Sequence, residues 1–223
     1  MIFALLFAGF CRAAEPLRIV ALGDSITKGV RSGVKAEETF AARLESALAT
    51  DGAKVSVTNV GIGGERTDQA LKRLAKDVVA QKPALVTIMY GTNDSYVDQG
   101  KSAARITVDE YRANLSRLVA ELRAVGITPV LMTAPRWGRG AKLNGAGEHP
   151  NVQLEQYVAA CRAVALEQRI PLVDHFQHWT TAEAKGTDIA TWTTDQCHPN
   201  PEGHRVIAEL MLPVIRTVFK VSP

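Results

Sequence analysis

Ser25, Asp195 and His198 are the residues whose types and spacing best support chemistry in this sequence of 223 residues. Ser25 stands in "IVALGDSITKG", where an apolar run ends in Gly-Asp-Ser and a hydroxyl could serve as nucleophile. A serine nucleophile needs an imidazole base, and the base needs a carboxylate that fixes its tautomer. The segment "DQCHPNPEGH" supplies both within three residues. Together these residues indicate acyl transfer, although each segment alone could also be an ordinary turn with a surface histidine.

The other histidines are weaker candidates for the base. His204 lies six residues after the candidate base, inside a helical pattern, and we expect it to pack or to cap. Asp174 adjoins His175, and we interpret this pair as a structural feature at a strand end. The remaining two have no carboxylate at a comparable spacing: His149 and His178.

Two further segments could supply hydrogen-bond donors for a developing oxyanion. In "NVGIGGERT", glycines permit close approach and unusual dihedral angles, and so can aim a backbone N–H at a ligand atom. In "YGTNDS", Asn93 offers a side-chain amide donor. Alone, "GIGGER" lacks the G-x-G-x-x-G spacing and a P-loop lysine, so it is weak support for nucleotide binding, and Asn-Asp is ordinary turn chemistry.

The elements that must position these residues alternate between strands and helices. Five apolar runs predict strands: 18–22, 55–60, 85–90, 128–133 and 171–173. Apolar residues at helical spacing predict helices over 37–49, 67–80, 107–126, 151–169 and 201–219. Thr67 is a candidate cap, Gly126 a stop, and Pro213 should kink or interrupt the last helix.

This alternation predicts an α/β fold with a parallel sheet and helices on both faces. Three irregular segments follow strands: 91–107, 134–150 and 175–200. Because ligands bind beyond the carboxyl ends of the strands in such sheets, these segments and Ser25 should meet at one edge.

Taken in order, the four segments resemble the SGNH hydrolases, also called GDSL esterases and lipases, over about Leu17 to Phe219. "GDSI" matches the serine block, with Ile26 replacing the usual leucine, and "GIGGERT" matches the glycine block. "GTND" and "DQCHPN" match the asparagine and Asp-x-x-His blocks. The resemblance implies a flavodoxin-like three-layer α/β/α sandwich and a rather open site.

The resemblance also implies roles for residues. Ser25 would attack an ester carbonyl, His198 would accept its proton, and Asp195 would orient His198. The backbone N–H groups of Ser25 and Gly64 and the side chain of Asn93 would hold the oxyanion. No metal or organic cofactor is implied.

The substrate is less specified than the reaction. We expect short-acyl, above all acetyl, esters of carbohydrates; the alternatives are a lysophospholipase or acyl-thioesterase, or a non-catalytic carbohydrate-binding protein on the same fold. Aromatic side chains in the site-facing segments could stack on sugar rings or merely anchor loops. These are Tyr96, Trp137, Trp179 and Trp192. Polar candidates for substrate contact are Asp24, Arg66 and Arg136.

Composition and the amino-terminal residues bound the remaining possibilities. A net charge of +3 without a Lys/Arg-rich run argues against a nucleic-acid partner. Residues 1–14 suit a signal peptide, possibly truncated, since the apolar run is too short to span a bilayer. We therefore expect a secreted or periplasmic protein without stable membrane insertion, or a cytoplasmic one if the segment is retained.

The length suits one domain, expected at 15–223. Cys11 is a poor lipid-anchor site because Phe10 precedes it. Cys161 and Cys197 could form one disulfide, but their spacing does not suit a zinc site. The oligomeric state is left open.

Overall fold

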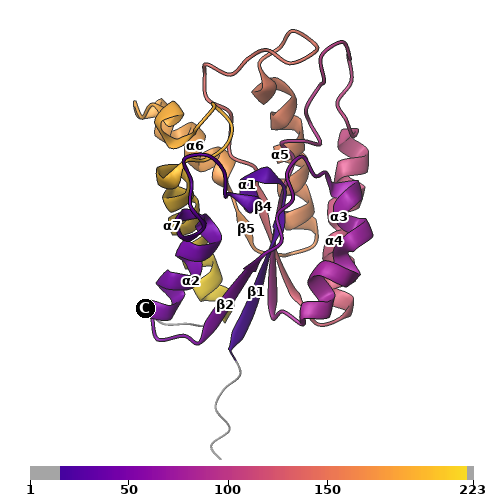
Figure 1. Cartoon of the computed structure of the whole chain (residues 1–223). Coiled ribbons are helices and arrows are strands. Elements are labelled where there is room, and N and C mark those ends of the chain that lie inside the picture. The colour runs from indigo at the N-terminus through magenta and orange to yellow at the C-terminus, as the bar shows by residue number, and fades with distance from the viewer. Residues whose placement is uncertain (1–15, 220–223) are drawn as a thin grey trace, which may run out of the picture.

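A parallel β-sheet lies at the centre of the computed structural model, which describes residues 16–219 (Figure 1). Its five strands run in the order β2-β1-β3-β4-β5. They are β1 (Leu17–Gly23), β2 (Val55–Asn59), β3 (Leu85–Tyr90), β4 (Thr128–Thr133) and β5 (Leu172–Val173). The predicted α/β fold with parallel strands and helices on both faces is thereby confirmed. The expected signal segment, 1–14, and Cys11 lie outside the described residues.

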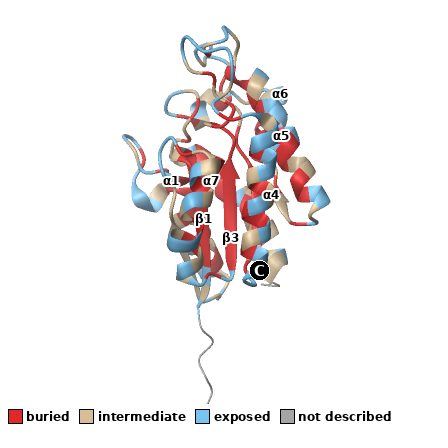
Figure 2. Cartoon of the chain, turned by 90° about the vertical axis from the view of Figure 1, so that its right-hand side faces the viewer, coloured by how far each residue is buried: buried red, intermediate tan, exposed pale blue. Residues whose placement is uncertain are grey.

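The central strands are largely apolar because helices cover both faces of the sheet. Every residue of β3 is buried, and β3 pairs with β1 on one side and β4 on the other (Figure 2). The edge strand β2 is only partly buried. The predicted bounds of β3 and β4 are confirmed, and those of the other strands differ by one residue at one or both ends.

Two helical layers flank the sheet (Figure 1). One face packs against α3 (Thr67–Arg73), α4 (Val108–Ala124) and α5 (Pro150–Glu167) through a single apolar cluster. A second cluster joins the opposite face to α2 (Phe40–Thr50) and α7 (Pro201–Phe219). Helix α4 ends at Ala124, two residues before the predicted stop at Gly126, which takes a left-handed φ of 77°.

Several local expectations need correction. Helix α6 (His175–Ala184) and a short 3₁₀ turn (Ile189–Trp192) occupy a segment predicted as irregular. Thr67 does not cap α3 but is its first residue, and α3 continues into a π turn (Leu74–Val78) and a 3₁₀ turn (Val79–Gln81). Helix α7 is not interrupted at Pro213.

The strand order places the candidate residues at one edge. Because the chain turns to β2 on one side of β1 and then to β3 on the other, the loops after β1 and β3 diverge and leave a crevice between them. Ser25 is the second residue after β1, and Asn93 is the third residue after β3. The fold therefore brings the serine and asparagine segments to the switch point of the sheet.

Candidate active site

Ser25 sits on a tight turn between β1 and the short helix α1 (Ser25–Lys28). A Cβ at Gly23 would lie 2.1 Å from Thr27 Oγ1 and 2.6 Å from the Met89 carbonyl oxygen, so only glycine permits this turn. Asp24 caps α1 by accepting the Ile26 N–H at 2.9 Å. As the first helical residue, Ser25 has no helical partner for its own N–H. Its hydroxyl and its N–H are thus both available at the sheet edge.

His198 faces Ser25 from the opposite end of the chain. Its Nε2 lies 2.9 Å from Ser25 Oγ, and its Nδ1 lies 2.8 Å from Asp195 Oδ2. A carboxylate only accepts hydrogen bonds, so Nδ1 carries the hydrogen and Nε2 is left to accept from the serine hydroxyl. This is the arrangement that a serine nucleophile with a general base requires.

The triad loop, residues 193–200, holds its carboxylate by local contacts. Asp195 Oδ1 accepts the backbone N–H groups of His198 at 2.8 Å and Cys197 at 3.2 Å. Arg31, from the segment after α1, donates to Asp195 Oδ2 at 2.9 Å. Partial burial works to raise the pKa of Asp195, but the hydrogen bonds from His198 outweigh it and hold that pKa below its ordinary value. The carboxylate is therefore ionised, and the 41% exposure of its side chain favours the same state.

A left-handed residue fastens the triad loop to the loop after β4. Gln196 has a φ of 71°, uncommon for a residue other than glycine. Its carbonyl accepts the Gly138 N–H at 2.7 Å, and its side-chain Oε1 accepts the Gly140 N–H at 3.1 Å. These contacts tie the position of the triad loop to that of Trp137 and its neighbours.

Asn93 stands on the other side of Ser25, between two charged partners. Its Nδ2 donates to Asp24 Oδ2 at 3.2 Å, and its Oδ1 accepts from Arg105 at 3.2 Å. Gly64, the other expected donor, lies in the loop after β2 with a φ of 77° and open space beside its Cα. It does not line the pocket that contains Ser25 and Asn93.

Three buried carboxylates lie beneath these donors, and we call Asp24, Glu65 and Asp94 the carboxylate cluster. Asp94 accepts the Thr67 N–H at 2.9 Å, the Thr67 hydroxyl at 2.6 Å and the Gly91 N–H at 3.2 Å. Glu65 accepts from the Tyr90 hydroxyl at 2.6 Å and from Arg73. The cluster therefore joins the glycine segment to the asparagine segment.

Burial changes the acidity of the cluster. Desolvation is the main cause that raises the pKa of Asp24 to about 7, and the charges of Asp94 and Glu65 add to it against the hydrogen bonds from Ile26 and Asn93. Desolvation likewise raises the pKa of Asp94, although hydrogen bonds from Thr67 and Gly91 oppose it.

A small pocket of about 150 Å³ opens beside the serine and histidine. Its lining residues are Ser25, Thr92, Asn93, Tyr96, Arg105, Trp137, Cys197 and His198. The Tyr96 and Trp137 rings stack at 5.9 Å, and the Asn151 side chain clamps the Trp137 backbone through two hydrogen bonds of 2.9 Å. The aromatic wall is thus held rigidly.

Other candidates for substrate contact lie outside this pocket. Asp24 is buried below it, Arg66 pairs with Asp68, and Arg136 pairs with Glu183. Two tryptophans, Trp179 and Trp192, pack edge to face at 5.2 Å in the core, as the loop-anchor alternative predicts.

The remaining histidines and cysteines have structural surroundings. His204 Nδ1 accepts the Phe40 N–H at the start of α2, which agrees with the capping interpretation. His175 is fully buried, and desolvation lowers its pKa to about 3. Cys161 and Cys197 are both buried free thiols, so they do not form a disulfide with each other.

Sequence reasoning missed Arg31 and Arg105, since neither stands at a spacing that marks a partner of Asp195 or Asn93. Within residues 16–219, no group of three or more His, Cys, Asp or Glu side chains is placed to hold a metal ion. Over the same residues, no helix has the length and apolar character needed to cross a bilayer.

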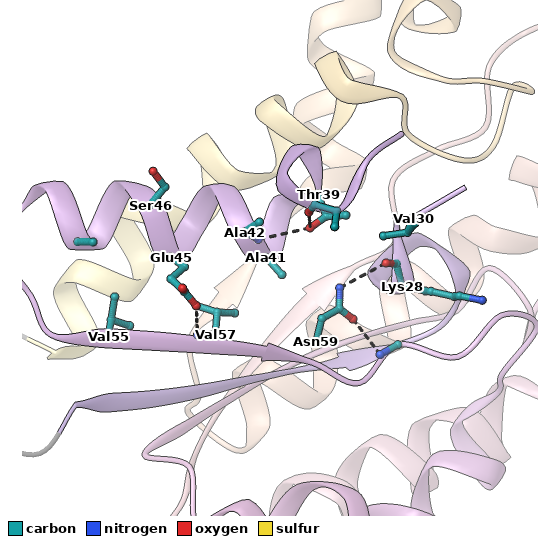
Figure 3. A pocket seen from close by; sticks show the side chains of 13 residues that line it. Lys28, Val30, Thr39, Ala41, Ala42, Glu45, Ser46, Val55, Val57 and Asn59 are labelled. Atoms are coloured by element: carbon teal, nitrogen blue, oxygen red, sulfur yellow. Dashed lines mark hydrogen bonds between the residues drawn. The ribbon is translucent and has the colours of Figure 1, made fainter. Parts of the chain in front are cut away.

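A larger hollow of about 580 Å³ lies elsewhere, between α2 and the edge strand β2 (Figure 3). It shares no lining residue with the pocket at Ser25. Within it, Glu45 accepts the Val57 N–H of the edge strand at 2.6 Å (Figure 3). Asn59, on the same wall, donates to the Thr27 carbonyl at 2.6 Å. Asn59 also accepts the Gly61 N–H, so it ties the end of α1 to the glycine segment.

Comparison with known proteins points to one family. Residues 21–206 match the model of the GDSL-like Lipase/Acylhydrolase family. The chain is 30% identical to "Uncharacterized lipoprotein YqeF" of Bacillus subtilis, with 94% of each chain covered. It is 29% identical to an acetylxylan esterase of Geobacillus stearothermophilus, over 87% of this chain and 92% of the other.

Among solved structures, the fold matches a lipase/acylhydrolase from Enterococcus faecalis with a TM-score of 0.76 at 26% identity. That match covers 92% of this chain and 97% of the other.

Proposed function

Because this chain belongs to the GDSL-like lipase/acylhydrolase family, we propose that it removes short acyl groups, above all acetyl, from carbohydrate esters. It is a carboxylic ester hydrolase of the SGNH/GDSL type. The proposal adds the catalytic residues and the class of ester that they hydrolyse. The observation that carries it is the 2.9 Å contact between Ser25 Oγ and His198 Nε2.

In the proposed reaction, Ser25 Oγ attacks the ester carbonyl carbon while His198 Nε2 takes its proton. Asp195 keeps the hydrogen on His198 Nδ1 and stabilises the imidazolium that forms. The tetrahedral intermediate collapses, and His198 returns the proton to the leaving alcohol oxygen. Water, deprotonated by the same imidazole, then releases the acid from Ser25.

The negative charge on the carbonyl oxygen requires donors in place before the reaction. We assign these to the Ser25 and Gly64 N–H groups and Asn93 Nδ2. Each such donor contributes about 3 kcal/mol to the stability of the transition state.

Pocket size supports a short acyl group. The pocket of about 150 Å³ is smaller than the 300 Å³ or more of ordinary ligand pockets, which suits acetyl better than a long acyl chain. The stacked Tyr96 and Trp137 rings stand on its wall and could contact a sugar. The similarity to an acetylxylan esterase supports the same substrate class.

Rates on p-nitrophenyl esters from acetate to decanoate test the acyl preference. We expect a steep fall beyond butyrate, and Trp137→Ala should restore part of the rate on hexanoate by widening the pocket. A maximum at long chains would favour a lysophospholipase or thioesterase instead. Acetate release should also be measured from acetylated xylan and other acetylated polysaccharides, with Ser25→Ala as the inactive control. The polysaccharide that releases most acetate identifies the alcohol part of the substrate.

We further propose a single domain over 15–223 and an extracytoplasmic location. Residues 1–14 suit a signal peptide, and a relative named a lipoprotein supports export. Fractionation of cells that express the full chain, with amino-terminal sequencing of the product, tests both; uncleaved enzyme confined to the cytoplasm would contradict export.

A further inference from the structure

We propose that Arg105 is a positioning residue that holds the Asn93 side-chain amide in the orientation needed to stabilise the oxyanion. The inference rests on the proposed function, in which Asn93 is an oxyanion donor. Arg105 lies in the loop between β3 and α4, twelve residues after Asn93. Its side chain nevertheless reaches back to the same pocket.

Three contacts fix the guanidinium of Arg105. Its Nε and one terminal nitrogen grip the two oxygens of Asp98 at 2.9 and 2.6 Å. Its Cζ lies 5.1 Å from the centre of the Tyr96 ring, within the range of a cation–π contact. The other terminal nitrogen is left to meet Asn93 Oδ1 at 3.2 Å. The backbone helps as well, because the Arg105 N–H donates to the Tyr96 carbonyl at 3.1 Å.

The partners of Asn93 determine which way its amide faces. A guanidinium has only donors, so the atom of Asn93 that meets Arg105 must be the amide oxygen. The nitrogen then faces Asp24 Oδ2 at 3.2 Å, where an acceptor is waiting. An amide nitrogen has two hydrogens, and only one is used by Asp24. The second remains for the oxyanion in the pocket that Asn93 shares with Ser25 and His198.

Without Arg105, the amide oxygen loses its donor, and only the contact with Asp24 Oδ2 still favours one of the two orientations of the amide. A flipped Asn93 would present its oxygen toward the pocket and would repel the developing negative charge. Arg105 also polarises the amide, since a donor on the carbonyl oxygen strengthens the N–H groups of the same amide as donors. Its effect should therefore fall on the chemical step rather than on substrate binding.

A different role for Arg105 would be direct contact with the substrate, because it lines the pocket. The two roles separate in a double-mutant cycle. A residue that acts through Asn93 has no effect once Asn93 is gone, whereas a substrate contact keeps its effect.

The experiment measures kcat and KM on p-nitrophenyl acetate for the wild type, Arg105→Met, Asn93→Ala and the double variant. Methionine keeps the apolar stem of arginine and removes the donors. We expect Arg105→Met to lower kcat about tenfold or more, with KM within about twofold, against a loss of about 10²-fold or more for Asn93→Ala. In the Asn93→Ala background, Arg105→Met should change kcat by less than about twofold.

Further variants keep the test independent of folding. Asp98→Asn loosens the anchor of Arg105 and should lower kcat less than Arg105→Met does, while Arg105→Lys keeps one donor and should be intermediate. Arg112→Ala, which breaks an exposed ion pair with Glu167, is the control and should leave kcat unchanged. Thermal unfolding of every variant, followed by circular dichroism, identifies any loss of fold.

The outcomes are distinct. Equal losses from Arg105→Met in both backgrounds, or a rise in KM with kcat unchanged, would overturn the positioning role. An unchanged kcat in Asn93→Ala would overturn the oxyanion assignment itself, and with it this inference.

Discussion

The triad loop and the carboxylate cluster both lie next to Ser25, yet they are built in opposite ways. In the triad loop, Asp195 is 41% exposed and contacts a histidine three residues away. In the carboxylate cluster, Asp24 and Asp94 are 1% and 0% exposed, and each has a distant partner in addition to a local backbone N–H. Asp24 meets Asn93 across 69 positions of the chain, and Asp94 meets Thr67 across 27.

The difference indicates how substitutions in the triad loop and in the carboxylate cluster should affect the protein. The base and its carboxylate share one short loop, so their mutual geometry depends little on the rest of the fold. The expected oxyanion donors lie in segments that follow three different strands, and buried long-range hydrogen bonds hold these segments together. We therefore expect changes in the triad loop to affect activity alone, and changes in the cluster to affect activity and stability together.

The largest effect should come from the triad. Ser25→Ala or His198→Ala removes the nucleophile or the base and should lower kcat on p-nitrophenyl acetate on the order of 10⁴-fold or more. The midpoint of urea unfolding should hardly change, because both side chains are only partly buried. His178→Ala is the matched control, since His178 is exposed and stacks on Trp192. Undiminished turnover in either variant would remove that residue from the mechanism.

Asp94→Ala should lower both activity and stability. The substitution leaves the Thr67 N–H, the Thr67 hydroxyl and the Gly91 N–H without their acceptor, and each unsatisfied buried group costs about 1–3 kcal/mol. We expect a loss on the order of 4 kcal/mol in urea unfolding. Asp68→Ala, at an exposed ion pair on α3, should cost less than about 1 kcal/mol. Equally small losses of unfolding free energy in the two variants would mean that the buried hydrogen bonds of Asp94 contribute no more than an exposed ion pair.

Asp24 should make stability depend on pH. Its pKa is about 7 in the folded protein against an ordinary value of 3.8, so the folded state holds a proton that the unfolded state releases between those values. Stability should therefore fall as the pH rises from about 4 to about 7, by at most about 4 kcal/mol at 1.36 kcal/mol per pH unit. Urea unfolding of wild type and Asp24→Asn should be measured at pH 5 and pH 8. The free energy of unfolding should fall less between these pH values in the variant than in the wild type. Equal falls would contradict the raised pKa of Asp24.

The smallest effect should come from Arg31, on the exposed side. Arg31→Gln removes a positive charge from Asp195 Oδ2, which leaves the carboxylate better able to stabilise a protonated His198. The value of kcat/KM on p-nitrophenyl acetate should rise by less than about threefold, because the pair is partly exposed and screened. Raised salt should shrink the difference between wild type and variant. A fall in kcat/KM would show that Arg31 acts in another way.

The parts of the molecule that the sequence predicted are those governed by short-range patterns. The apolar strands β3 and β4 and the helix that ends shortly before Gly126 follow from hydrophobic spacing and from a glycine with positive φ. The meeting of Ser25 with His198 follows from strand ends that share one edge. The four segments alone were enough to predict that these two residues meet.

Other features depend on contacts that spacing does not encode. Helix α6 was missed because its buried face is formed by His175, Phe176 and Trp179 rather than by regularly spaced aliphatic residues. Thr67 was expected to cap α3, but its hydroxyl donates to Asp94 from another loop. Arg31 reaches Asp195 across 164 positions, which only the folded loops determine.

The contact between Ser25 and His198 spans 173 positions, from the first strand to the segment before the last helix. Such a pair closes only after nearly all of the intervening chain has been arranged, because distant contacts require the loop between them to be closed first. During refolding, esterase activity should therefore return only when α7 has packed against the sheet. Its recovery should be slower than the circular dichroism signal of helices that form locally.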